Sequence, residues 1–148
     1  MAQKSNFYGS YFFNQSTYAL YQGGTKWTNY KVSLTMKSTN NSALGVMFRY
    51  KDKNNYYRFS WDKNRKLRQL VKKSNGSFTV LSTNSGVPYV KSRDYQVDIV
   101  ASGATLQVFI DNALVIQTTD SSLSSGSIAL FSWANAGSYF DNIVVRGL

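Results

Sequence analysis

Residues 44–61 read LGVMFRYKDKNNYYRFSW, and this stretch decides how the chain folds. Two runs of alternating apolar and polar side chains flank the four polar residues DKNN, a pattern typical of two antiparallel strands joined by a short loop. The register that we expect sets Arg49 opposite Arg58 and Phe48 opposite Phe59, because polar and apolar side chains then separate onto different faces. A shift by one residue would place Phe48 against Arg58 and mix the faces.

The same alternation continues on both sides of this hairpin, and no window combines helical periodicity with capping residues. Turn signals at Asn75-Gly76, Ser102-Gly103 and Asp111-Asn112 separate the runs. The sequence therefore predicts an all-β chain of short, mostly antiparallel strands in a sandwich or barrel. The eleven expected strands cover residues 17–21, 30–37, 44–51, 56–61, 66–73, 78–84, 95–102, 105–110, 113–119, 126–132 and 138–146.

The composition restricts the chemistry that the chain can perform. Its 148 residues contain no His, no Cys and no Glu, and all seven acidic residues are Asp. A thiolate nucleophile, an imidazole base, a Cys/His zinc site and a Glu general acid are therefore excluded. A hydrophobic share of 43% with 16% aromatic residues indicates a folded globular protein. We expect a single domain over residues 1–148 and no enzymatic activity.

The charge balance points to the kind of partner. Seventeen Lys and Arg residues give a formal net charge of +10, which favours polyanions such as acidic polysaccharides, nucleic acids or anionic lipids. No zinc knuckle, phosphate loop or recognition helix is present, but basic charge with aromatic residues leaves single-stranded nucleic acid open. No apolar run approaches the ~20 residues of a membrane span, so we expect no membrane insertion. Richness in Ser, Asn, Thr, Gly and Tyr without Cys fits a module of a larger secreted protein. We expect the isolated module to be a monomer.

Four motifs follow one another along the chain: WTNYKVSLTMK, GVMFRYKDKNNYYRFSW, YQVDIVASGATLQVFIDNALV and GSIALFSWANAGSYFDNIVV. This order resembles the concanavalin A-like jelly rolls of the laminin-G and bacterial carbohydrate-binding-module type, over residues 27–145. The resemblance implies an antiparallel β-sandwich. It also implies a non-catalytic member, because enzymes on this fold generally use pairs of Glu residues on the concave sheet, which this chain lacks.

A strip of basic side chains on consecutive strands is the first candidate site, since guanidinium groups bind carboxylates and sulfates through two hydrogen bonds. The alternative is a solvated outer face, with Asp52 and Asp62 as counter-charges. The strip consists of Arg49, either Tyr56 or Tyr57, Arg58, Arg68 and Lys72.

Aromatic side chains form the second candidate, because sugar rings stack their C–H faces on flat aromatic groups beside hydrogen-bonding side chains. The aromatic set consists of Tyr50, Trp61, Tyr89, Trp133 and Tyr139. Two of its members, Trp133 and Tyr139, would form an alternative site at the loop end with Asn135 and Asp141. For any single aromatic residue the alternative is that it fills the core between two sheets. The sequence does not choose between the two locations.

A structural calcium ion is the third candidate, although no cofactor is required. The resemblance implies that Asp141 contributes a ligand, with Asn142 or a backbone carbonyl near Asn14. Calcium takes six to eight oxygen ligands, and the seven Asp residues are scattered along the chain. The alternative for Asp141 is therefore a turn residue that accepts local hydrogen bonds.

These observations lead to one functional hypothesis and one alternative. We expect a non-catalytic, secreted carbohydrate-binding module that tethers a parent enzyme or surface protein to a polysaccharide, with an acidic one favoured by the charge. The alternative is a laminin-G-like adhesion domain that binds protein or glycosaminoglycan.

Overall fold

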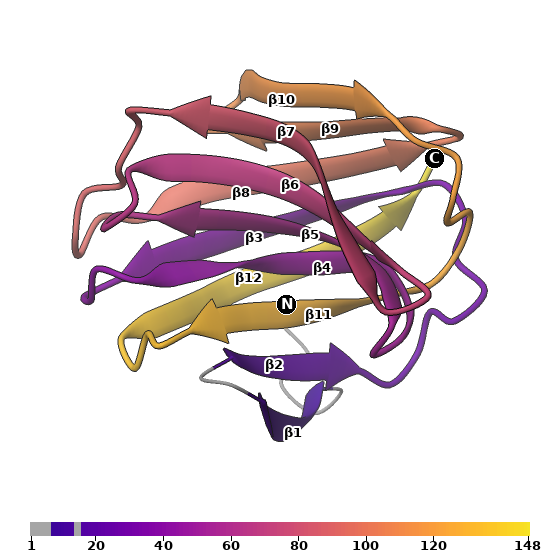
Figure 1. The fold of residues 1–148 in the computed structure, drawn as a ribbon, viewed down its shortest axis with the longest axis horizontal. Helices are drawn as coiled ribbons and strands as arrows, with labels where there is room; N and C mark the ends of the chain where they lie inside the picture. Colours follow the sequence, from indigo (N-terminus) through magenta and orange to yellow (C-terminus); the bar gives the residue numbers. More distant parts are fainter. Residues whose placement is uncertain (1–6, 14–15) are drawn as a thin grey trace.

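The chain folds into two antiparallel β-sheets packed face to face, as a computed structural model shows for residues 7–13 and 16–148, with only the backbone described for 7–13 (Figure 1). Sheet A has seven strands in the order β1-β2-β11-β4-β5-β6-β7, and sheet B has five in the order β10-β9-β8-β3-β12. The strands of sheet A are β1 (Phe7–Phe13), β2 (Ser16–Tyr21), β4 (Ala43–Asp52), β5 (Asn55–Asp62), β6 (Leu67–Ser74), β7 (Ser77–Ser85) and β11 (Ser127–Trp133). Those of sheet B are β3 (Tyr30–Ser38), β8 (Tyr95–Ser102), β9 (Thr105–Ile110), β10 (Ala113–Thr119) and β12 (Ser138–Gly147).

The core lies between the two sheets and follows the period-two alternation of the strands. Along β3 every second side chain is buried, from Tyr30 to Met36, while those between face the solvent. Phe48, Phe59 and the other inward residues of sheet A pack against these side chains. The predicted concanavalin A-like sandwich is therefore confirmed.

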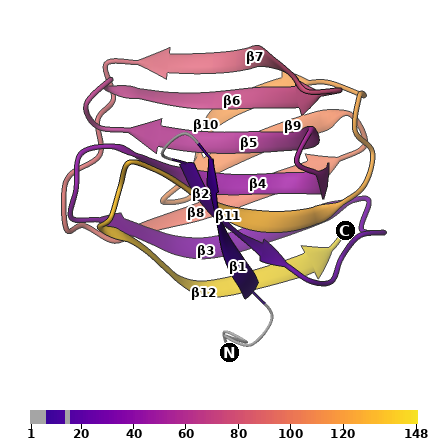
Figure 2. The same ribbon diagram turned by 60° about the horizontal axis from the view of Figure 1, so that its bottom comes forward.

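The eleven predicted strands correspond to β2 through β12, and the structure adds β1, which pairs with β2 at one edge of sheet A. Figure 2 shows this hairpin next to β11. Its sequence, FYGSYFF, places aromatic residues at consecutive positions, so it lacks the period-two alternation on which the prediction rests. No helix in the described part of the chain is long and apolar enough to cross a membrane.

The β4–β5 hairpin departs from the predicted register. Met47, rather than Arg49, pairs with Arg58, and the pairing shifts between Phe48 and Asp52. Arg49 lies inside this irregular stretch with a φ of 45°. A bulge of this kind places extra residues in one strand and redirects their side chains. The prediction that Arg49 and Arg58 lie side by side on one face is therefore wrong.

Candidate functional site

The outer face of sheet A, the side away from sheet B, carries a guanidinium group between two aromatic rings. Arg58 of β5 places its guanidinium carbon 4.4 Å from the ring centroid of Phe131 on β11. The same carbon lies 5.4 Å from the ring centroid of Phe78 on β7. Contacts at these distances are favourable cation–π interactions, so strands on both sides of β5 hold Arg58 in place.

Arg58 has no carboxylate partner among the residues that the structure describes. The described residues form two salt bridges, Lys72 to Asp120 and Arg93 to Asp111, and neither includes Arg58. Its Nε atom is buried, and no described residue forms a hydrogen bond with it. Burial lowers the pKa of Arg58, an effect that the neighbouring Tyr56 opposes. Arg58 is thus a partly desolvated cation with unused hydrogen-bonding capacity.

A second cation and a pair of stacked rings extend this surface. Tyr50 and Tyr56 stack with their ring centroids 5.7 Å apart. The ammonium nitrogen of Lys73 lies 5.8 Å from the ring centroid of Tyr56 and 5.0 Å from that of Phe78. Phe78 is 55% exposed, whereas both tyrosines are buried, so the tyrosines form the floor. We define the Arg58 surface as Tyr50, Tyr56, Arg58, Lys73, Phe78 and Phe131.

Arg49, which we predict to contact a ligand, is only 1% exposed. Its guanidinium group donates hydrogen bonds to oxygen atoms within the protein. Its Nε and Nη2 donate to the carbonyl of Thr28 at 3.1 and 3.0 Å. Its Nη1 donates to the carbonyls of Gly103 and Leu123 at 2.7 and 3.0 Å, and Nη2 also reaches Asn29 Oδ1 at 3.3 Å. Arg49 therefore joins separate chain segments, and the bulge that turns it inward removes it from any surface site.

The structure also separates Trp61, Arg68 and Lys72 from Arg58. Trp61 pairs with Arg68 across β5 and β6, and Lys72 pairs with a residue next to Arg58. Because side chains alternate between faces, these three point to the inner side. Lys72 is bound to Asp120 at 2.8 Å, and the Arg68 guanidinium lies 5.3 Å from the Trp61 ring. Of the predicted basic strip, the structure brings together only Tyr56 and Arg58 on the outer face of sheet A.

The predicted loop-end site is divided between different parts of the fold. Trp133 is 40% exposed and lies on sheet A, where it pairs with Ala43. Tyr139 is 54% exposed and lies on the outer face of sheet B. Asn135 is buried, and its Nδ2 donates to the carbonyl of Ser42 at 2.8 Å. It fixes the loop and cannot contact a ligand, because its polar atoms already have partners inside the protein.

The residues around Asp141 do not fit a calcium ion. Its carboxylate accepts a hydrogen bond from the backbone N–H of Asn142 at 2.8 Å, which is the behaviour of a turn residue. The described residues contain no group of three or more acidic, His or Cys side chains that could hold a metal. Asn14, the other proposed contributor, lies outside the described residues.

Sequence reasoning missed Phe78 and Lys73, although a signal for both was present. The Asn75-Gly76 turn joins β6 to β7, and Lys73 pairs with Phe78 directly across it. A two-residue hairpin loop fixes this pairing. Extending the register from the turn would have placed Lys73 and Phe78 together on one face.

Comparison with known proteins identifies several that are similar to this chain. It is 30% identical to the levanase of Bacillus subtilis (strain 168) over 116 residues, which is 77% of this chain and 17% of that protein. The carbohydrate-binding module CBM66 from Bacillus subtilis superposes with a TM-score of 0.82 at 22% identity, covering 92% of this chain and 84% of that one. Sheep galectin-11 superposes with a TM-score of 0.69 at 15% identity, covering 86% and 97%.

These superpositions show the shared sandwich fold, and the sequence itself shows the family. Residues 12–146 match the family described as the 3-keto-alpha-glucoside-1,2-lyase-like domain. The match spans β2 through β11 completely and β12 up to its penultimate residue. The chain belongs to the 3-keto-alpha-glucoside-1,2-lyase-like domain family.

Proposed function

We propose that this domain is a carbohydrate-binding module that binds an acidic polysaccharide on the Arg58 surface. The observation that carries the proposal is the Arg58 guanidinium, which is held between Phe131 and Phe78 without a carboxylate partner in the described part of the chain. A sugar carboxylate or sulfate would supply the missing acceptor, and a charge-assisted contact of this kind is stronger than one between neutral groups.

The side chains around Arg58 suit a sugar polymer. Phe78 offers an exposed ring on which the C–H face of a sugar can stack. Lys73 adds a second cation next to that ring. The surface spreads over several strands and is not enclosed, which suits a polymer that lies across the sheet.

The relatives support the same class of function. Carbohydrate-binding module CBM66 shares the fold, and the levanase relative is much longer than the segment that matches this chain. On this basis the domain tethers a parent enzyme or surface protein, outside the cell, to its polysaccharide. In this proposal the parent protein supplies any catalysis, because this chain lacks the His, Cys and Glu side chains that many catalytic acids, bases and nucleophiles use.

Affinity electrophoresis tests the proposal with matched arginine variants. Wild type, Arg58→Ala and Arg146→Ala are run through gels that contain polygalacturonate, alginate, heparin, neutral glycans or single-stranded DNA, at low and high salt. Arg146 is an exposed residue of β12 in the other sheet, so its variant removes the same charge from another surface. We expect retardation by at least one acidic glycan, weakened about tenfold or more by Arg58→Ala and by high salt, but not by Arg146→Ala.

Other outcomes would replace the proposal. If Arg58→Ala and Arg146→Ala weaken the retardation equally, the binding depends on the net charge of the protein and not on the Arg58 surface. Retardation by single-stranded DNA without retardation by a glycan would favour nucleic acid, since aromatic and basic side chains also bind single strands. If no polymer retards the protein, the laminin-G-like alternative of a protein-binding adhesion domain would take its place.

A further inference from the structure

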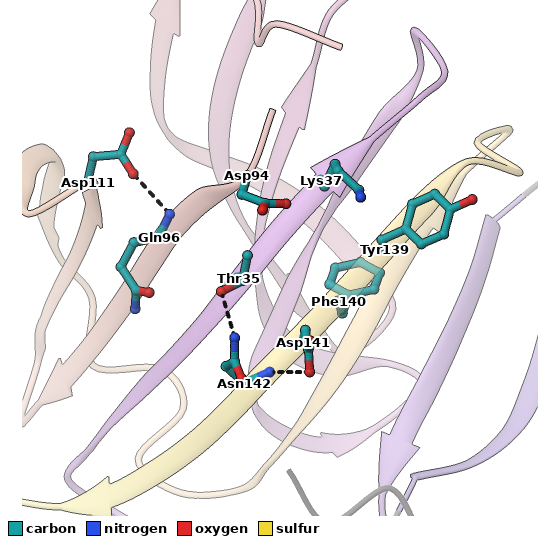
Figure 3. A pocket seen from close by; sticks show the side chains of 9 residues that line it. All are labelled: Thr35, Lys37, Asp94, Gln96, Asp111, Tyr139, Phe140, Asp141 and Asn142. Atoms are coloured by element: carbon teal, nitrogen blue, oxygen red, sulfur yellow. Dashed lines mark hydrogen bonds between the residues drawn. The ribbon is translucent and has the colours of Figure 1, made fainter. Parts of the chain in front are cut away.

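The outer face of sheet B carries a depression with a volume of about 650 Å³ (Figure 3). Thr35 and Lys37 of β3 and Gln96 of β8 line it, and Tyr139 and Asp141 of β12 form one side. The register pairs Thr35 with both Gln96 and Asp141, so Thr35 lies on the strand between them. These side chains face away from sheet A, and hence from the Arg58 surface.

An exposed aromatic ring stands at one end of the depression. Tyr139 is 54% exposed, and the ammonium nitrogen of Lys37 lies 5.0 Å from its ring centroid. Beyond it, β12 bulges between Asp141 and Val144, which places Asn142 where its Nδ2 donates to Thr35 Oγ1 at 3.3 Å. A flat aromatic face therefore adjoins a row of short polar side chains on a rigid sheet.

The lining differs in charge from the rest of this basic protein. Three carboxylates, those of Asp94, Asp111 and Asp141, line the depression together with the single cation Lys37. Arg93 neutralises Asp111 through a salt bridge of 3.1 Å. An anionic polymer gains nothing from such a lining, and these carboxylates form no cluster that could hold a metal in the described part of the chain. The carboxylate oxygens are distributed along the depression and do not converge on one point, so they suit a ligand that is larger than a single ion.

We propose that this depression is a second glycan-binding site, which takes an uncharged sugar unit with neighbouring hydroxyl groups. The hydroxyls donate to the carboxylates of Asp94 and Asp141 and to the side-chain carbonyl of Gln96, while the C–H face of the sugar ring stacks on Tyr139. The site is independent of the Arg58 surface, because it lies on the other sheet and uses acceptors where that surface uses cations.

The test uses the full chain with Arg58→Ala as background, so that the first site cannot contribute. Isothermal titration is performed with four neutral glycans, namely levan, mixed-linkage β-glucan, arabinoxylan and galactomannan, and with a chitosan oligosaccharide as a cationic comparison. Tyr139→Ala and Asp94→Asn remove the ring and one acceptor, and Asp52→Asn is the control for loss of a carboxylate at an exposed turn. Circular dichroism verifies that each variant is folded.

We expect at least one neutral glycan to bind equally at low and high salt. Tyr139→Ala and Asp94→Asn should each weaken that binding by about tenfold, and Asp52→Asn by less than about twofold. The proposal is overturned if no neutral glycan binds, or if binding is indifferent to both variants. Binding of a cationic chitosan oligosaccharide alone would also overturn it, in favour of charge attraction. Failure here leaves the acidic-glycan test unaffected, because that test depends on Arg58 and this one is performed without it.

Discussion

Arg49 and Arg58 belong to neighbouring strands of the same hairpin, yet their surroundings differ in almost every respect. Arg49 faces inward, and oxygen atoms from three other parts of the chain accept its hydrogen bonds. Arg58 faces outward between two rings, and none of the residues described in the structure accepts a hydrogen bond from its buried Nε. The comparison teaches that burial alone does not identify a functional arginine. What distinguishes the two is whether the protein itself satisfies the donors.

The largest expected effect is the loss of stability in Arg49→Met. Methionine fills much of the same volume but leaves the carbonyls of Thr28, Gly103 and Leu123 without their donor. We expect the free energy of unfolding to fall by about 3–5 kcal/mol, since buried acceptors would lose a charged partner. Urea denaturation followed by circular dichroism measures it. A loss below about 1 kcal/mol would show that water replaces the guanidinium without cost.

Gly126→Ala tests the bulge from the other side of β4, at the residue that directly precedes β11. Gly126 has a φ of 145°, and a Cβ added there would lie 2.4 Å from the carbonyl carbon of Arg49. We expect a loss of about 2–4 kcal/mol in unfolding free energy, because both the backbone conformation and the close approach disfavour a side chain. Gly147→Ala is the control, since nothing lies within 4 Å of its added Cβ. Equal melting temperatures of the two variants would contradict the assigned role.

Arg58→Met should show the reverse of Arg49→Met. An apolar chain of similar length keeps the contacts with Phe131 and Phe78 and removes the unsatisfied Nε. We therefore expect stability to remain unchanged or to rise by up to about 2 kcal/mol, while binding of acidic glycans weakens about tenfold or more. Denaturation and affinity electrophoresis on the same samples check both parts. A fall in stability as large as that of Arg49→Met would make Arg58 a structural residue.

The smallest expected effect on stability comes from Asp120, and this effect depends on pH. Its burial opposes ionisation, but hydrogen bonds from Lys72, Tyr57 and Ser122 outweigh that effect and lower its pKa to about 2. Because the folded pKa lies below the ordinary value of 3.8, the carboxylate stabilises the fold above about pH 4. This contribution, about 1–2 kcal/mol after allowance for solvent screening, is lost as the pH falls toward 2.

The matching variant is Asp120→Asn, which removes the charge and keeps the shape. We expect it to be less stable than wild type at pH 7 and to approach wild type below about pH 3, in thermal melts between pH 2 and 7. A stability difference that is independent of pH would mean that the ion pair with Lys72 does not contribute.

The sequence predicted the sandwich and its strands well because both depend on local alternation. Tyr30 through Met36 alternates perfectly, and the structure buries the expected side of β3. The β4–β5 register was beyond such reasoning, because the bulge coincides with contacts between Arg49 and segments far away along the chain, which local alternation does not report. A pattern of period two contains no information about where an extra residue enters a strand.

The candidate site was predicted in part for the same reason. Tyr56 and Arg58 alternate along one strand, so their shared face follows from the sequence. The contribution of Phe131 depends on β11 lying next to β4, which only the folded topology provides. The loop-end group failed because Trp133 and Tyr139 belong to strands of different sheets. Nearness along the chain does not keep two residues together where the chain passes from one sheet to the other.

The contacts of Arg49 also determine when during folding they can form. Its partners Thr28, Gly103 and Leu123 lie 21, 54 and 74 residues away along the chain. Contacts of this span require both sheets to have met, so they belong to the last stage of folding. Replacing Arg49 should therefore speed unfolding and leave the folding rate nearly unchanged. The hydrogen bonds of Arg49 therefore determine the lifetime of the folded domain through the unfolding rate, and they contribute little to the folding rate.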